Sequence, residues 1–142
     1  MSDMKSQDLV NQSMANEWML LQNQFDSYEK YSLIIKLAGV AVFAGAYFAG
    51  KTSVLMTILL LVIWLQDAIW KTFQARIENR LLQLEAGLKT ESDEKAYQFN
   101  REYLKNRPGT LGLVKEYLSQ SVRPTIAFPH VVLVLMSAVQ LI

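Results

Sequence analysis

A lone carboxylate, Asp67, closes an apolar segment in the stretch Trp-Leu-Gln-Asp-Ala-Ile-Trp-Lys, residues 64–71. Acidic side chains inside membrane helices usually pair with a cation, carry protons or line an ion path. An unpaired charge at the centre of such a helix costs about 2.5–3.5 kcal/mol, and the cost falls towards the interface. Asp67 therefore requires a partner or contact with headgroup water.

Lys36 is the cation that matches Asp67 in depth. It is the one charged residue in the apolar segment 31–50, and it lies fifteen residues before Lys51 while Asp67 lies sixteen after it. If the chain folds back at Lys51, the two side chains meet in an intramembrane ion pair. Two alternatives stay open. Lys36 extends to the interface while Asp67 sits in headgroup water beside the tryptophans, or Asp67 carries protons or ions.

His130 stands next to Pro129 in a third apolar segment. Proline removes a hydrogen bond from the helix ladder, so this position would suit a polar lining within the membrane. A single histidine near an interface is, however, more often a hydrogen-bonded structural residue. The chain has no cysteine and no second histidine, so we expect no metal site.

The remaining composition argues against other chemistry. Fourteen basic residues balance thirteen acidic ones, which leaves no net field to attract nucleic acid. The sequence has no glycine-rich phosphate loop, no candidate nucleophile paired with a base, and no repeated carboxylate motif. We therefore expect no enzyme, no cofactor and no nucleic-acid partner.

The hydrophobic content predicts membrane-spanning helices. With 51% hydrophobic residues in 142 and a mean hydropathy of +0.14, the chain is typical of an all-α integral membrane protein. Residues 31–50 and 53–70 are long enough to span, and the short connection at Lys51 makes them an antiparallel hairpin. Residues 125–142 form a third membrane helix of marginal length, which crosses or dips in from one side; we expect it to cross.

The distribution of basic residues predicts the orientation. The hairpin turn offers only Lys51, so the positive-inside rule places residues 1–30 and 71–124 in the cytoplasm of a multi-pass inner-membrane protein. The N-terminus lacks the apolar core of a cleavable signal peptide. Ten basic residues lie between the second and third spans: Lys71, Arg76, Arg80, Lys89, Lys95, Arg101, Lys105, Arg107, Lys115 and Arg123.

Apolar residues recur at spacings of three and four on both sides of the hairpin, which is typical of a coiled-coil seam. If the chain folds at Lys51, the two stripes face each other, and residues 10–49 and 53–88 form two long antiparallel helices. Alternatively, each stripe buries its apolar face elsewhere. The cytoplasmic seam comprises Trp18, Leu21, Phe25 and Tyr28 before the first span, and Phe73, Ile77, Leu81 and Leu84 after the second.

Two shorter helices are expected within the cytoplasmic region 71–124. The acidic residues 90–94 predict a helix start before residues 96–105, and Arg107-Pro108-Gly109 predicts a turn. Residues 110–122 then form an amphipathic helix, which lies on the membrane surface or against the other cytoplasmic helices. Its apolar face carries Leu111, Val114, Leu118 and Val122.

Small residues form a stripe at Ala41, Gly45 and Ala49 on the first span. Such stripes let helix backbones approach closely and drive association in lipid. The stripe serves either packing against the second span or contact between chains. A three-span protein has few internal neighbours, so we expect contact between chains.

Together these features predict a non-catalytic membrane protein. We expect a self-associating scaffold, a homo-oligomer, or an accessory subunit of a larger membrane complex. The alternative is an oligomeric pore-forming or membrane-disrupting effector gated by its cytoplasmic helical region. A transporter or enzyme subunit ranks third.

Overall fold

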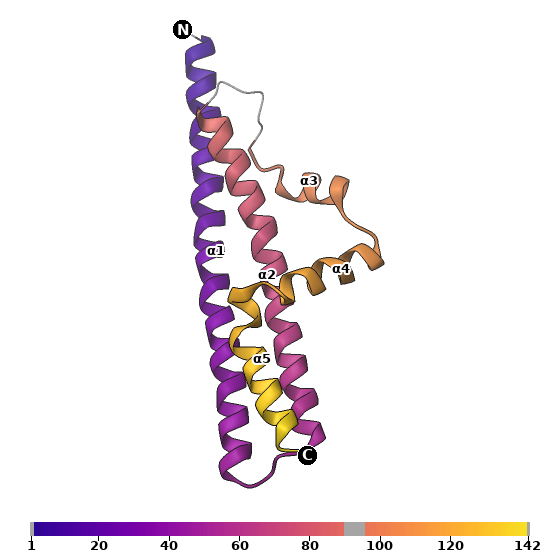
Figure 1. The fold of residues 1–142 in the computed structure, drawn as a ribbon. Coiled ribbons are helices and arrows are strands. Elements are labelled where there is room, and N and C mark those ends of the chain that lie inside the picture. Colours follow the sequence, from indigo (N-terminus) through magenta and orange to yellow (C-terminus); the bar gives the residue numbers. More distant parts are fainter. Residues whose placement is uncertain (1, 90–95, 142) are drawn as a thin grey trace. The chain divides into compact units, whose positions relative to one another are not determined.

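The computed structural model describes residues 2–89 and 96–141, and every regular element in them is an α-helix. Figure 1 shows two long helices, α1 (Ser2–Phe48) and α2 (Val54–Lys89), packed antiparallel. Helix α2 agrees within one residue with the helix expected over residues 53–88, whereas α1 ends near the expected residue 49 but begins eight residues before the expected start at residue 10. Three shorter helices follow: α3 (Phe99–Asn106), α4 (Thr110–Ser121) and α5 (Pro124–Val139).

The chain divides into two compact units, and α1 and α2 contribute to both. We call Tyr28–Phe73 with Thr110–Ile142 the apolar unit, and Met1–Ser27 with Gln74–Gly109 the seam unit. Helices α4 and α5 therefore belong to the apolar unit, and α3 belongs to the seam unit.

A tight turn joins α1 to α2. Gly50 adopts φ 63°, a left-handed conformation that glycine accepts without a steric penalty and that commonly ends helices. The amide of Lys51 donates to the carbonyl of Ala46 at 2.9 Å, which satisfies one of the last carbonyls of α1. Ser53 Oγ accepts from the amide of Met56 at 3.4 Å, as expected of a residue that caps the start of α2.

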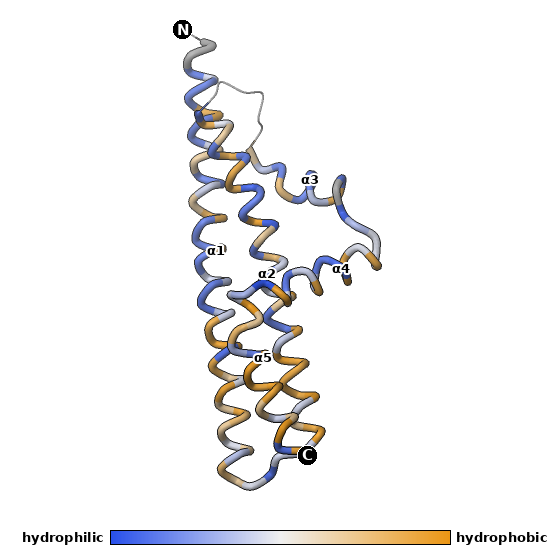
Figure 2. Tube along the Cα trace, in the orientation of Figure 1, coloured by the Kyte–Doolittle hydropathy of each residue, from blue (hydrophilic) through white to orange (hydrophobic). Residues whose placement is uncertain are grey.

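In the apolar unit, α5 packs antiparallel to α2. Thr57 lies against Ser137 and Asp67 against His130, so residue numbers rise on one helix as they fall on the other. The buried core contains Phe43, Met56, Leu60 and Leu133. Figure 2 shows that α5 and the parts of α1 and α2 next to the turn are predominantly hydrophobic.

The outer surface of the apolar unit is also hydrophobic. Leu37, Leu55 and Ile58 are each more than half exposed, which suits a helix bundle surrounded by lipid. Two of the described helices, α1 and α2, are long and apolar enough to cross a membrane.

The third apolar segment differs from the continuous helix expected over residues 125–142. Helix α5 is interrupted at Phe128, whose ψ is 130°, because the residue before a proline is disfavoured in the α conformation. The part after the break, residues 129–139, is about 16 Å long at 1.5 Å per residue. Helices α4 and α5 meet at a bend of 78°, and they qualify as a third candidate span only when taken together.

The seam unit buries four of the eight expected seam residues. Leu21, Ile77, Leu81 and Leu84 lie in its interior together with Met14. Trp18 and Phe25 are partly buried, and the Trp18 indole N–H donates to Glu85 Oε1 at 3.1 Å. The two stripes therefore meet within one unit.

One seam residue was wrongly expected. The side chain of Phe73 is 40% exposed, whereas Gln74 is 4% exposed and donates through Nε2 to the carbonyl of Phe25 at 3.2 Å. Leu60, Asp67, Gln74 and Leu81 follow a strict seven-residue repeat, which is the geometry of a coiled-coil seam. Hydrophobicity alone assigns Phe73 to this position of the seam, but the seven-residue repeat assigns Gln74 to it.

The start of α3 was also expected too early. Tyr97 has φ 60°, so the helix begins at Phe99 rather than Ala96. The acidic residues 90–94 that were expected to cap this helix lie outside the described residues.

Candidate functional site: a buried polar cluster

Asp67 lies on the inner side of α2, within the apolar unit. Its side chain is fully buried, and Ala68 beside it is equally inaccessible. Burial follows from the seven-residue repeat, which continues from the seam unit into the candidate span and places Asp67 where Leu60 stands one repeat earlier. A carboxylate in this position must obtain all its hydrogen bonds from the protein.

Both oxygens of Asp67 are engaged by groups of this chain. Oδ1 accepts from Ser32 Oγ at 2.5 Å. Oδ2 lies 2.9 Å from Lys36 Nζ and 3.1 Å from His130 Nε2. Helix α1 thus supplies two partners and α5 supplies one, so the carboxylate of α2 ties three helices together.

Lys36 and Ser32 close a ring of polar contacts with the carboxylate. Lys36 Nζ donates to Ser32 Oγ at 2.7 Å, and that hydroxyl donates onward to Asp67. Residues four apart lie on the same helix face, so α1 presents both groups together. The lysine side chain remains 17% exposed, whereas Ser32 is 1% exposed.

His130 is held by packing as well as by its hydrogen bond. It is 1% exposed, and its ring stacks on Trp64 with centroids 6.4 Å apart and planes 13° from parallel. Gly39 is buried beside this ring: a Cβ added there would lie 3.9 Å from His130 Cε1 and 3.6 Å from a methyl group of Leu133, both ordinary van der Waals distances. Position 39 of α1 therefore packs directly against α5, with space for no more than a small side chain.

The cluster comprises one carboxylate, one ammonium, one hydroxyl and one imidazole, each engaged with another member. Such an arrangement resists separation of the helices, because losing any one contact would strand a buried polar group. Its nucleophilic atom, Ser32 Oγ, is buried and already shared between Lys36 and Asp67. The geometry suits positioning of helices better than attack on a substrate.

The other expected site residues lie on the opposite surface. Ala41, Gly45 and Ala49 are all exposed. Among the described residues, none outside the helix's own neighbourhood places an atom within 4 Å of a Cβ built at Gly45. The stripe is thus not used for packing within the apolar unit, where Gly39 provides the close contact.

Sequence reasoning brought Lys36 and Asp67 together but omitted three participants. It did not include Ser32 or Gly39, and it treated His130 separately from Asp67. The spacing of Ser32 to Lys36 was a usable signal, because it places both on one face of α1. Nothing comparable marked His130, since no register rule linked the third apolar segment to the hairpin.

Two further polar contacts hold α4 and α5 against α2. The hydroxyls of Thr57 and Ser137 lie 2.6 Å apart, and the indole N–H of Trp64 donates to the carbonyl of Ser121 at 3.1 Å. At the other end of the unit, Trp70 contacts Tyr28 and Tyr31. This grouping of aromatic rings is typical of a membrane interface.

The seam unit contains a second buried ion pair. Glu17 accepts from Arg80 through both oxygens, at 3.0 Å from Nε and 3.3 Å from Nη2. The amide of Tyr97 also donates to Glu17. Arg80 lies 3.8 Å from Glu102 on α3. These contacts fix the segment that leads into α3 against the two long helices.

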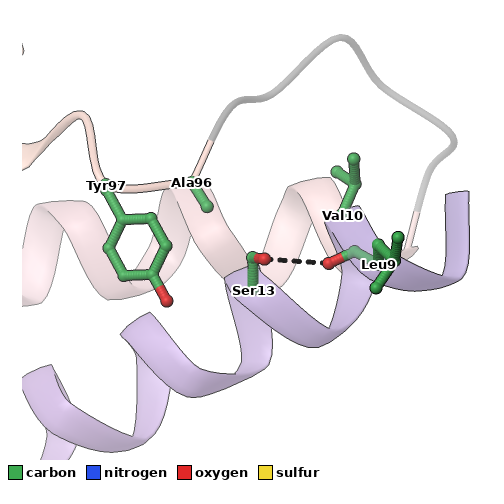
Figure 3. A pocket seen from close by; sticks show the side chains of 5 residues that line it. All are labelled: Leu9, Val10, Ser13, Ala96 and Tyr97. Atoms are coloured by element: carbon green, nitrogen blue, oxygen red, sulfur yellow. Dashed lines mark hydrogen bonds between the residues drawn. The ribbon is translucent and has the colours of Figure 1, made fainter. Parts of the chain in front are cut away.

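A small open hollow of about 240 Å³ lies nearby, lined by Leu9, Val10, Ser13, Ala96 and Tyr97 (Figure 3). Ser13 Oγ is turned back to the carbonyl of Leu9 at 2.8 Å, so the hollow presents little polar chemistry. Among residues 2–89 and 96–141, no group of three histidine, cysteine or acidic side chains could hold a metal ion.

No family model, curated protein or solved structure matches this chain.

Proposed function

We propose that this protein is a non-catalytic assembly subunit of a membrane, which associates through the exposed face of its first span. The observation that carries the proposal is the contrast between two glycines on α1. Gly39 packs against Ile63 and Leu133, whereas Gly45 faces outwards between the exposed Ala41 and Ala49. Gly39 makes contacts within the chain, whereas the stripe of Ala41, Gly45 and Ala49 is exposed and can contact another helix.

The buried cluster supports this proposal because it satisfies the carboxylate of α2 within the chain itself. Asp67 is neutralised and hydrogen-bonded by Ser32, Lys36 and His130. A three-helix module locked in this way can present a rigid outer surface to a second copy or to a larger membrane complex. Small residues on that surface allow the close backbone contact that stabilises helix pairs in lipid.

A pair of substitutions separates the two glycines. Gly45→Leu should weaken chain association in detergent while leaving thermal stability of the monomer unchanged, because the new side chain holds backbones apart only between chains. Gly39→Leu should lower monomer stability, because it meets Leu133 and His130. Val40→Leu is the matched control, since it enlarges an exposed residue outside the stripe. Unchanged association of both Gly45→Leu and Ala41→Leu would contradict the proposal.

The alternative function is an oligomeric pore or membrane-disrupting effector, favoured by the presence of a carboxylate in a candidate span. Purified protein in liposomes distinguishes the two functions. Proton or ion flux that disappears in Asp67→Asn, with stability retained, would support the pore. Absence of proton and ion flux with the wild-type protein would contradict the pore and favour the assembly subunit.

We also propose that the seam unit is cytoplasmic, in an inner membrane, because Lys51 is the lone basic residue of the hairpin turn. The cysteine-free sequence allows single cysteines to be introduced directly. A cysteine at position 51 should react with an impermeant reagent from outside intact cells. Labelling of a cysteine at position 101 from that side would contradict this orientation.

A further inference from the structure

Helix α4 exposes its apolar side and buries a polar one. Leu111, Val114, Leu118 and Val122 are 87%, 49%, 58% and 70% exposed, whereas Gln120 is 8% exposed. The first three recur at spacings of three and four within α4, so they share one helix face, and Val122 follows directly after the helix ends at Ser121. This is the reverse of a helix that packs its apolar face onto a water-soluble protein.

The orientation of α4 follows from its attachment to the apolar unit. Helix α5 lies along α2, as the contacts of Thr57 with Ser137 and of Asp67 with His130 require. Helix α4 departs from α5 at 78°. It therefore runs almost perpendicular to the candidate span α2, in the direction of a membrane plane that α2 crosses.

Trp64 attaches the C-terminal end of α4 to α2. Its indole N–H donates to the carbonyl of Ser121 at 3.1 Å. Trp64 is three residues from Asp67 on α2, at the end of the most apolar stretch. The end of α4 is therefore tied to the part of α2 where its uncharged stretch ends.

Charge on α4 and directly after it is complementary to a lipid surface. Lys115 on α4 and Arg123, two residues beyond its end, are exposed, and the acidic residue of this segment, Glu116, is partly buried and engaged in a polar contact. Exposed basic residues beside an apolar face are the usual composition of helices that bind anionic membranes.

We propose that α4 is an interfacial anchor that binds bilayer lipid. The exposed side chains of Leu111, Val114 and Leu118 on α4, with Val122 just beyond it, enter the boundary between headgroups and acyl chains, while Lys115 and Arg123 contact anionic headgroup phosphates. The apolar surface of α4 continues into the lipid-facing surface of the apolar unit through Val122 and Phe128, which is 67% exposed. This inference does not depend on the proposed function.

The test uses the full chain with a single cysteine at position 118, labelled with a polarity-sensitive fluorophore and reconstituted into vesicles of neutral and anionic lipid. Position 119, also exposed on α4 but off the apolar face, is the matched control. The label at position 118 should be quenched several-fold more by lipid-borne nitroxides than by aqueous iodide, and the label at 119 should show the opposite. A cysteine at position 114 repeats the measurement on the same face.

Two outcomes would overturn the proposal. Strong iodide quenching at positions 114 and 118 would place the face in water. Protection of both positions from iodide and from lipid-borne nitroxides would show that protein, such as a second copy, covers it.

A double variant, Lys115→Gln with Arg123→Gln, tests the two cations. The quenching of the label at 118 by lipid-borne nitroxides should then differ little between anionic and neutral vesicles. An unchanged difference would refute the role of the two cations.

Discussion

The apolar unit and the seam unit each bury a carboxylate, but they satisfy it with different donors. In the seam unit, the fork of Arg80 engages both oxygens of Glu17. In the apolar unit, three separate side chains engage Asp67. Arginine remains charged under all conditions and binds carboxylates with fixed geometry. Lysine carries its charge on a flexible apolar stem, and Lys36 remains 17% exposed.

This difference matches the surfaces of the two units. The seam unit exposes charged residues such as Lys5, Asp8 and Glu78. Its buried Arg80–Glu17 pair therefore lies in a unit whose surface is charged. The apolar unit exposes mainly leucine, isoleucine and valine, so its cluster must be nearly neutral and complete in itself. A buried carboxylate is thus satisfied by a single arginine in the unit with a charged surface, and by three separate side chains in the unit with a hydrophobic surface.

The largest expected effect comes from breaking the Arg80 pair. Arg80→Met leaves Glu17 buried without its cation, although the Tyr97 amide still donates to it, and removal of one member of a buried pair costs about 3–5 kcal/mol. Hydrogen exchange of the reconstituted protein should rise in residues 14–21 and 77–84 and stay unchanged in residues 130–137. Arg101→Met, at an exposed position of α3, is the control. Equal exchange in both variants would show that the pair contributes nothing.

The second effect concerns Asp67 and Lys36. Asp67→Asn and Lys36→Met should each lower thermal stability in detergent by about 2–3 kcal/mol, the order of cost of an uncompensated charge in a span. The double variant should lose less than the sum, because neither charge is then stranded. Strictly additive losses would show that the two charges are independent in spite of their 2.9 Å separation.

A smaller effect is expected at His130. His130→Phe retains an aromatic ring against Trp64 and loses the contact with Asp67, so stability should fall by about 0.5–1.5 kcal/mol, as for a single hydrogen bond. Thermal unfolding in the same detergent measures it. A loss as large as that of Asp67→Asn would make His130, rather than Lys36, the principal partner of the carboxylate.

The smallest effect is expected at Trp18. Its indole N–H donates to the exposed Glu85, and water replaces such a partner readily. Trp18→Phe should change stability by no more than about 0.5 kcal/mol, measured by thermal unfolding. A larger loss of stability would show that the packing of the larger indole ring, rather than its hydrogen bond, stabilises the seam.

The hairpin could be predicted because sequence distance from the turn determines its register. Lys36 and Asp67 are almost equally far from Lys51, and the stripes in the seam unit follow the same symmetry. Helix α5 has no such constraint. Its contact with Asp67 joins residues 63 apart, and the intervening chain includes a bend of 78° that composition does not specify. The break at Phe128 was signalled by Pro129, but the direction taken afterwards was not.

Gln74 and Gly39 illustrate a second limit. Hydrophobicity assigned Phe73 to the seam, although the seven-residue repeat places Gln74 there, with a hydrogen bond to the carbonyl of Phe25 that compensates its burial. Gly39 and Gly45 look equivalent in sequence. The positions of α2 and α5 make Gly39 an internal contact, through Ile63 and Leu133, and leave Gly45 exposed.

The shared carboxylate also has a consequence for biosynthesis. Ser32 and Lys36 are synthesised before Asp67, so the hairpin can neutralise its charge as soon as α2 is complete. His130 emerges from the ribosome 63 residues later. A chain that stops before α5 therefore lacks the His130 contact with Asp67 Oδ2 and leaves an unfilled surface at Gly39, where Leu133 and His130 would otherwise pack.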